Sequence, residues 1–215
     1  MEETVRVENR DVRQQVSSVL VSFDAELITD PVVAFSTESQ TIYEVVVQNK
    51  RRSGVADTFN LNYSGDFDLK KGDFIYITGD LRVMFKQDGE TSYKYDYIYA
   101  KTIQLLAEEP DDYINKIQVN NCYIKELIES RKSYQNNDVD VTTCSVTLVR
   151  QGNKVGIFNL NSWGRDALYL AEIAKPNAKI NFEGRLQSYT TKGGKRRITI
   201  VTYSIDKESR SKKEV

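Results

Sequence analysis

Apolar and polar residues alternate along much of the chain, in short runs rich in β-branched and aromatic side chains. Such runs predict strands, and glycines or Asp-Gly pairs separate them. In the first half we expect strands over residues 41–47, 58–63, 74–81 and 93–105. In the second half we expect them over residues 118–124, 139–149, 155–160, 179–186 and 197–205. The pattern therefore predicts an all-β protein.

One segment has helical periodicity instead. Between residues 166 and 174, apolar side chains recur on one side of a helix, at Ala167, Leu170, Ala171 and Ala174, and Pro176 follows. This helix would lie between the third and fourth strands of the second half. The matching stretch of the first half, residues 66–71, is too short for more than a turn.

The two halves also share an internal repeat. Phe59–Gly65 recurs as Phe158–Gly164, and Ile77–Arg82 is echoed by Phe182–Gln187, each about one hundred residues later. A period of this length indicates a duplicated domain, and the acidic stretch around Pro110 separates the copies. We expect an N-terminal segment, two domains and a basic tail, over residues 1–17, 18–109, 115–206 and 207–215.

About five strands in each half is the strand count of the OB-fold, a five-stranded barrel. We therefore predict two tandem OB-fold barrels, the second with a helix between its third and fourth strands. The first barrel is expected to be the more divergent, because it lacks that helix pattern.

The composition excludes several classes of protein. No run of about eighteen apolar residues occurs, and residues 1–13 carry charges throughout, so we expect a cytoplasmic chain without a membrane segment. Histidine is absent, which removes the commonest general base and metal ligand. Cys122 and Cys144 form no Cys-x-x-Cys pair and are expected to be reduced and packed. We expect no enzyme activity, no cofactor and no metal.

The net charge of −1 hides an asymmetry between the halves. Residues 18–109 hold 9 Lys and Arg against 15 Asp and Glu, whereas residues 115–206 hold 14 against 8. Nucleic acid is attracted to basic surface, so the second half is predicted to be the main binding domain.

The densest basic cluster lies on a predicted hairpin tip, close to Tyr189. It comprises Lys192, Lys195, Arg196 and Arg197. In an OB barrel this hairpin joins the last two strands beside the binding groove, so contact with phosphates is one interpretation. The alternative is a solvated turn whose charges keep the chain soluble.

Trp163 is the single tryptophan and ends a predicted strand. Alternation puts Phe158 and Leu160 on one face and Trp163 on the other, so an inward Phe158 would turn Trp163 outward. Trp163 could then stack on a base while Arg165 contacts the adjacent phosphate, and Tyr189 is a similar candidate for stacking. The alternative is a tryptophan that plugs the barrel.

Tyrosines alternate along one predicted strand of the first half, at Tyr93, Tyr95, Tyr97 and Tyr99. Four rings on one face could stack bases, and Tyr95 and Tyr97 are candidates for that role. They could equally form a subunit interface, where tyrosine is enriched.

The run Asn161–Ala167, a helix, and then Ile180–Tyr189 resembles the signature of the bacterial and phage single-stranded DNA-binding protein family. That signature is a strand ending in Trp-Gly-Arg, a helix, and a Gly-Arg-Leu strand. A divergent first barrel, followed by a second barrel that retains the signature more fully, is similar to a tandem OB-fold subfamily. The resemblance implies cytoplasmic proteins that coat single strands, commonly as oligomers. The basic tail departs from the acidic tail that recruits partners in bacterial members.

From these observations we expect non-enzymatic, largely sequence-independent binding of single-stranded DNA in replication, recombination or repair. The expected partners are single-stranded DNA, further copies of the chain, and replication or recombination proteins. The alternative is an OB-fold protein-interaction or assembly module of a replication or mobile-element system. The acidic first half and the neutral total support that alternative.

Overall fold

The computed structural model describes residues 15–65, 67–133 and 138–207. The first half forms six strands: β1 (Ser18–Leu27), β2 (Val32–Ser36), β3 (Thr41–Lys50), β4 (Ala56–Ser64), β5 (Phe74–Asp88) and β6 (Thr91–Leu106). The second half forms five strands and an α-helix: β7 (Asn115–Lys132), β8 (Asp140–Val149), β9 (Val155–Trp163), α1 (Arg165–Ile173), β10 (Lys179–Thr190) and β11 (Arg196–Lys207). The predicted all-β class is confirmed.

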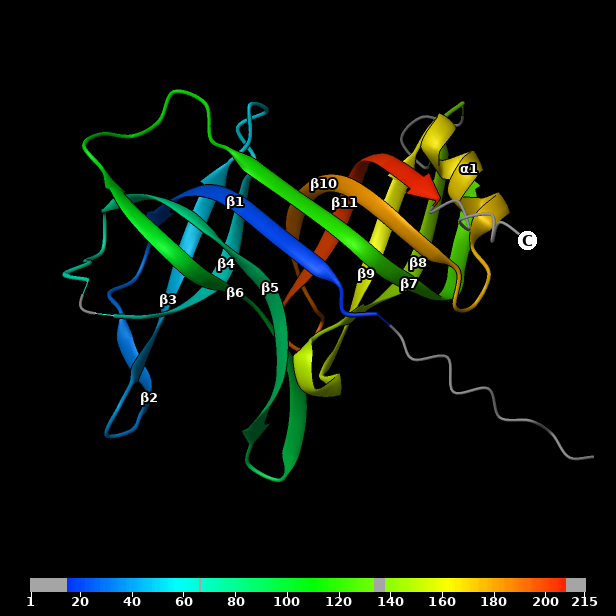
Figure 1. Cartoon of the computed structure of the whole chain (residues 1–215). Coiled ribbons are helices and arrows are strands. Elements are labelled where there is room, and N and C mark those ends of the chain that lie inside the picture. The colour runs from blue at the N-terminus through cyan, green and yellow to red at the C-terminus, as the bar shows by residue number, and fades with distance from the viewer. Residues whose placement is uncertain (1–14, 66, 134–137, 208–215) are drawn as a thin grey trace, which may run out of the picture.

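The eleven strands form one continuous sheet that curls into two barrels lying side by side (Figure 1). Its strand order is β10-β11-β9-β8-β7-β1-β5-β6-β4-β3-β2. The first barrel closes where β1 also pairs with β3, and the second where β7 also pairs with β10. The third and fifth strands of each barrel pair in parallel, β4 with β6 and β9 with β11. Both barrels therefore have the predicted OB topology, with β2 as an addition to the first.

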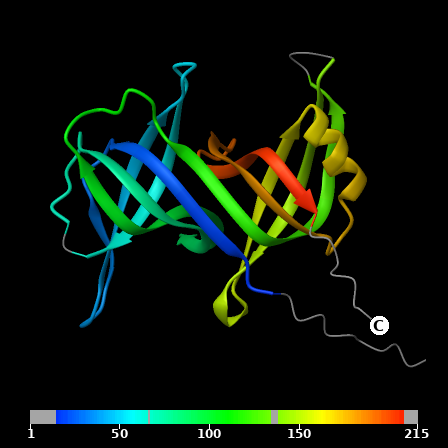
Figure 2. The ribbon, with the colours of Figure 1, turned by 45° about the horizontal axis from the view of Figure 1, so that its top comes forward.

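Helix α1 lies between β9 and β10, where the sequence predicted it, and covers one end of the second barrel (Figure 2). It buries Ala167, Leu170 and Ile173. The predicted apolar positions Ala171 and Ala174 are only half-buried. In the first barrel, the described residues between β4 and β5 contain no helix.

Two strands were missed from the sequence, and each has an identifiable cause. In β1, Asp24 is buried between Phe23 and Ala25, so the strict alternation of apolar and polar positions is broken. The side chain of Asp24 accepts a hydrogen bond from the backbone N–H of Ile114 at 2.7 Å, which compensates its burial. Strand β2 is exposed along its whole length and pairs only with β3, so it carries no buried face.

The repeated Gly-x-Leu motif marks the same irregularity in both barrels. Strand β5 shifts register against β6 at Gly79, and β10 shifts against β11 at Gly184. A Cβ atom on either glycine would collide with a carbonyl oxygen of the neighbouring strand, that of Tyr99 or Val201. The motif therefore reflects a β-bulge that requires glycine, which explains why this part of the repeat is shared.

The barrels are joined where their first strands meet. β1 and β7 pair antiparallel, from Ser18 opposite Asn120 to Phe23 opposite Asn115. Of the predicted N-terminal segment, residues 15–17 lie against the second barrel, where Ser17 Oγ donates to the carbonyl oxygen of Asn121 at 2.7 Å. The rest of that segment, and the tail beyond residue 207, lie outside the described residues.

Each barrel has an apolar interior. Cys122 and Cys144 are both unpaired thiols in the core of the second barrel, as predicted. Burial raises the pKa of the Cys144 thiol from its ordinary 9.0 to about 12.

No helix in the described part of the chain is long and apolar enough to cross a membrane.

Candidate nucleic-acid interface

Trp163 occupies the last position of β9, directly before α1. Phe158, Leu160 and Ser162 point into the barrel and are buried, whereas Trp163 is 45% exposed. Gly164 then adopts a φ of 62° and turns the chain into the helix, which starts with the exposed Arg165. The predicted outward orientation of Trp163 is confirmed, and the barrel-plug alternative is wrong. Base stacking on Trp163 stays a prediction.

The hairpin between β10 and β11 has the predicted basic tip. Its turn is closed by a hydrogen bond from the Thr191 N–H to the Lys195 carbonyl oxygen at 2.9 Å. Tyr189, at 42% exposure, and Lys192 face solvent on this hairpin. Both side chains are therefore accessible to a ligand.

The sequence suggested that the other three cations of the hairpin are free to contact phosphate or solvent. In the structure they are not free. They reach the first barrel: Lys195 Nζ lies 2.5 Å from Asp88 Oδ2, Arg196 Nη1 2.6 Å from Asn60 Oδ1, and Arg197 Nε 2.8 Å from Asp96 Oδ2. Burial lowers the pKa of Arg196, and the hydrogen bond that Lys195 donates to Asp88 raises the pKa of Lys195. The basic hairpin of one barrel thus docks on the acidic surface of the other.

Asp96 is the centre of this contact. Its carboxylate is fully buried and binds two cations, Lys94 at 2.9 Å and Arg197 at 2.8 Å, one from each barrel. It also accepts the backbone N–H of Ile198 at 3.1 Å. Burial lowers the pKa of Lys94, and the charge of Asp96 opposes that shift. Lys94 Nζ further contacts the carbonyl oxygen of Ile157 in the second barrel.

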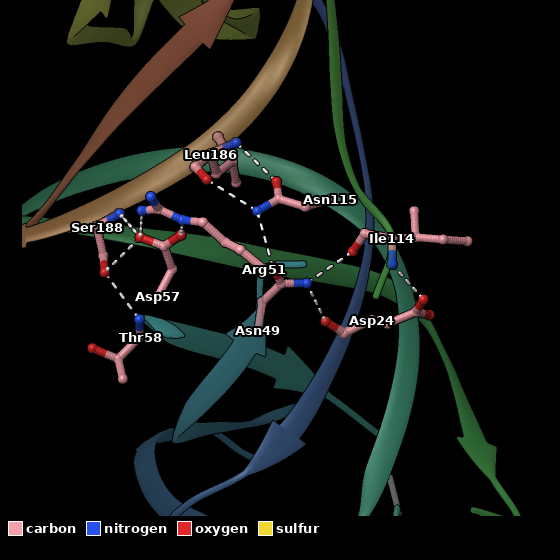
Figure 3. A network of polar contacts seen from close by, with 9 residues as sticks. All are labelled: Asp24, Asn49, Arg51, Asp57, Thr58, Ile114, Asn115, Leu186 and Ser188. Carbon is pink, nitrogen blue, oxygen red and sulfur yellow. Dashed lines mark hydrogen bonds and ion pairs between the residues drawn. The ribbon is translucent and has the colours of Figure 1, made fainter. Parts of the chain in front are cut away.

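Figure 3 shows a second polar network, which is next to the first because Ser188 pairs with Ile198 across β10 and β11. Asp57 Oδ1 accepts the Ser188 N–H at 2.8 Å, and Arg51 holds the same carboxylate from within the first barrel. Asn115 forms a pair of hydrogen bonds with the backbone of Leu186, at 2.8 and 3.0 Å. Sequence reasoning missed these positions because an aspartate at the start of a strand gives no signal of a partner about 130 residues away.

The tyrosines of β6 share one face as predicted, but two of them are largely covered. Tyr95 and Tyr97 are 6% and 8% exposed, with their ring centroids 5.7 Å apart. Three cations lie over tyrosine rings of this row. Measured to the ring centroid, Lys195 lies 4.1 Å from Tyr93, Lys86 3.7 Å from Tyr95 and Arg82 3.7 Å from Tyr99. Each of these cations also pairs with a carboxylate, Lys195 with Asp88, Lys86 with Glu44 and Arg82 with Asp80. The row therefore combines tyrosine rings with cations whose charge is partly compensated.

A groove of about 460 Å³ lies over one end of this row on the first barrel. Tyr97 and Tyr99 form part of its lining, together with Asn62 of β4. The remaining lining residues come from β2, β3 and β5: Ala34, Phe35, Ile42, Glu44, Arg82, Met84 and Lys86. Sequence reasoning missed the groove because β2, which supplies Phe35, was not predicted.

No arrangement of ligands for a metal ion is found in the described residues, where no three His, Cys, Asp or Glu side chains are suitably grouped.

Comparison with known proteins gives a likeness in structure alone. No family model matches the sequence, and no curated protein matches it. The wild-type single-stranded DNA binding protein from Thermus aquaticus superposes with a TM-score of 0.72 at 15% identity, covering 94% of this chain and 98% of that chain. A deletion mutant of the same Thermus protein gives a TM-score of 0.72 at 15% identity, over 93% and 99%. This chain therefore has the two-barrel fold of that protein over nearly its whole length.

Proposed function

We propose that the chain binds single-stranded DNA, largely independently of sequence and without catalysing a reaction, in DNA replication, recombination or repair. The two-barrel likeness to a protein described as a single-stranded DNA binding protein supports this proposal. Replication or recombination proteins and further copies of the chain are its predicted partners.

The observation that carries the proposal is the row of tyrosines with cations stacked on it. Proteins that bind single strands combine aromatic faces, on which bases stack, with cations that neutralise phosphates. Here Lys86, Arg82 and Lys195 lie within about 4 Å of tyrosine rings along β6. A solvated charged surface would not require aromatic rings beneath its cations.

We propose that both barrels contribute to the surface. The charge totals of the sequence placed the main binding surface on the second barrel. There, Trp163 and Tyr189 are exposed and available to stack on bases, and Arg165 and Lys192 are exposed and available to contact phosphates. The groove extends this surface to the first barrel, where Tyr97 is one of its lining residues.

The remaining candidates have contacts that suggest different roles. Lys195 is part of the cation row and is 39% exposed, so it can contact a phosphate. Arg196 and Arg197 are proposed to position the hairpin, because their guanidinium groups already bind Asn60 and Asp96. Tyr95 is proposed to support Lys86 from beneath rather than to stack on a base.

A protein-interaction or assembly module is the second candidate. It is favoured by the neutralisation of the basic hairpin, since Asp88 and Asp96 already pair with Lys195 and Arg197. This module would show little affinity for nucleic acid.

The two candidates are separated by comparing a single strand with a duplex of the same length. We expect the purified chain to bind a labelled oligo-dT of about 12 nucleotides well, and the duplex at least about tenfold more weakly, because paired bases cannot stack on aromatic side chains. Fluorescence anisotropy measures both affinities. Equal affinity for the two would indicate charge attraction alone, and binding of neither would favour the interaction module.

A further inference from the structure

The groove on the first barrel contains buried polar atoms that have no partner in the protein. Asn62 is 3% exposed and lines the groove, and its Oδ1 accepts no hydrogen bond. Arg82 Nε is likewise buried without an acceptor, although Arg82 Nη2 donates to Asp80 Oδ2 at 3.3 Å. Buried polar groups are normally paired, because leaving one unpaired costs the free energy of its lost solvation. One acceptor and one donor, both covered from solvent, thus lack a partner on residues that line the same groove.

The sequence repeat offers an internal comparison for this feature. Asn60, two residues earlier on the same face of β4, has its Oδ1 bound by Arg196 Nη1 at 2.6 Å. Asn161, which occupies the position of Asn62 in the second copy, accepts from Thr143 Oγ1 at 3.0 Å. At this duplicated position the side-chain oxygen is hydrogen-bonded in the second barrel and unpaired in the first. An unpaired amide is therefore not a general property of this motif.

The apolar part of the lining and the volume of the groove suit a flat aromatic ligand. Phe35 and Ile42 contribute apolar side chains from β2 and β3, and Met84 contributes one from β5. Phe35 is 58% exposed, so one face of its ring is available for stacking. A volume of about 460 Å³ accommodates a base together with its sugar.

We propose that this groove takes one nucleobase of the bound strand and recognises its edge as well as its face. The base would be a keto base, whose ring N–H donates to Asn62 Oδ1 and whose adjacent carbonyl oxygen accepts from Arg82 Nε–H. The positive charge of the guanidinium favours a base edge that presents a carbonyl oxygen over one that presents an N–H donor. This inference rests on the proposed function, and it adds a preference for thymine, uracil or guanine at one position of the strand.

The test compares oligo-dT of about 12 nucleotides with an oligomer of the same length built from N3-methylthymidine. Methylation removes the N–H donor and keeps the ring face, so stacking is retained while edge recognition is lost. For the wild-type chain we expect the methylated oligomer to bind at least about fivefold more weakly, the effect of one hydrogen bond. Fluorescence anisotropy gives both dissociation constants.

Three variants identify the groups responsible. In Asn62→Leu the ratio of the two dissociation constants should fall to about one. Thermal unfolding should occur at no lower temperature, because a buried amide whose oxygen is unpaired is replaced by an apolar group of similar volume. Arg82→Lys keeps the charge but removes the Nε–H donor, so the ratio should also fall. Asn161→Leu, at the repeat-related position, should keep the wild-type ratio whatever its effect on overall affinity.

The outcomes separate this inference from the proposed function. Tight binding of both oligomers with a ratio near one in the wild type, or an unchanged ratio in both Asn62→Leu and Arg82→Lys, would overturn edge recognition and leave single-strand binding standing. Failure of either oligomer to bind at about 50 mM salt would overturn both proposals.

Discussion

At the scale of single residues, the contact between the barrels depends on one carboxylate. Asp96 is fully buried and binds Lys94 and Arg197, which lie on different barrels. Alternation along β6 correctly put the tyrosines on one face, but it gave no indication that Asp96, on the opposite face, has a partner about one hundred residues away. Periodicity reports the direction of a side chain and not the element that it meets.

We expect Asp96→Asn to lower the free energy of unfolding by about 3 kcal/mol, because two partly buried cations lose their counter-charge. Asp88→Asn is the matched control. Asp88 is 61% exposed, and its pair with Lys195 should contribute less than about 1 kcal/mol. Urea denaturation of both variants measures the difference, and equal losses would show that the buried carboxylate has no special role.

Trp163 is the residue whose orientation followed most directly from the sequence. Replacing it by alanine should weaken binding of oligo-dT by about 1–3 kcal/mol if a base stacks there. The fold should be unaffected, because the side chain is half exposed at a strand end. Trp163→Phe, which retains a ring, serves as the control. Normal binding by Trp163→Ala would remove this residue from the site.

At the scale of elements, sequence reasoning located nine of the eleven strands and the helix, since these have a buried face or a buried stripe. It missed β1 because of the buried Asp24 and β2 because it has no buried face. Because β2 was not predicted, the groove was missed as well, since Phe35 on β2 supplies part of its lining. Exposed strands that extend a binding surface leave little trace in a hydrophobic pattern.

The bulge in β10 gives a prediction at this scale. Gly184→Ala should destabilise the chain by about 1–3 kcal/mol, because the added Cβ meets the carbonyl oxygen of Val201. Gly79→Ala should do the same in the first barrel. Gly193→Ala is the control, since the atom nearest to its Cβ would be Thr191 Oγ1 at 4.0 Å. Thermal unfolding of the three variants tests this, and a loss at Gly193 as large as that at Gly184 would contradict it.

At the scale of the whole molecule, the opposite charges of the halves have a consequence that their totals did not reveal. The sequence suggested a basic barrel that binds and an acidic barrel that contributes little. In the structure part of the basic charge is neutralised by the acidic barrel, since Lys195 pairs with Asp88 and Arg197 with Asp96. One continuous sheet and these contacts hold the two barrels together as a single unit. Charge totals describe segments, whereas binding depends on which charges remain uncompensated after folding.

The most direct test of the central claim is a titration of labelled oligo-dT with the full chain at several salt concentrations. Each phosphate contact on a single strand releases counterions and contributes roughly −0.7 to the slope of log affinity against log salt. About four contacts, from cations that remain accessible, predict a slope of roughly −3. A slope near zero, or no binding at about 50 mM salt, would contradict the account.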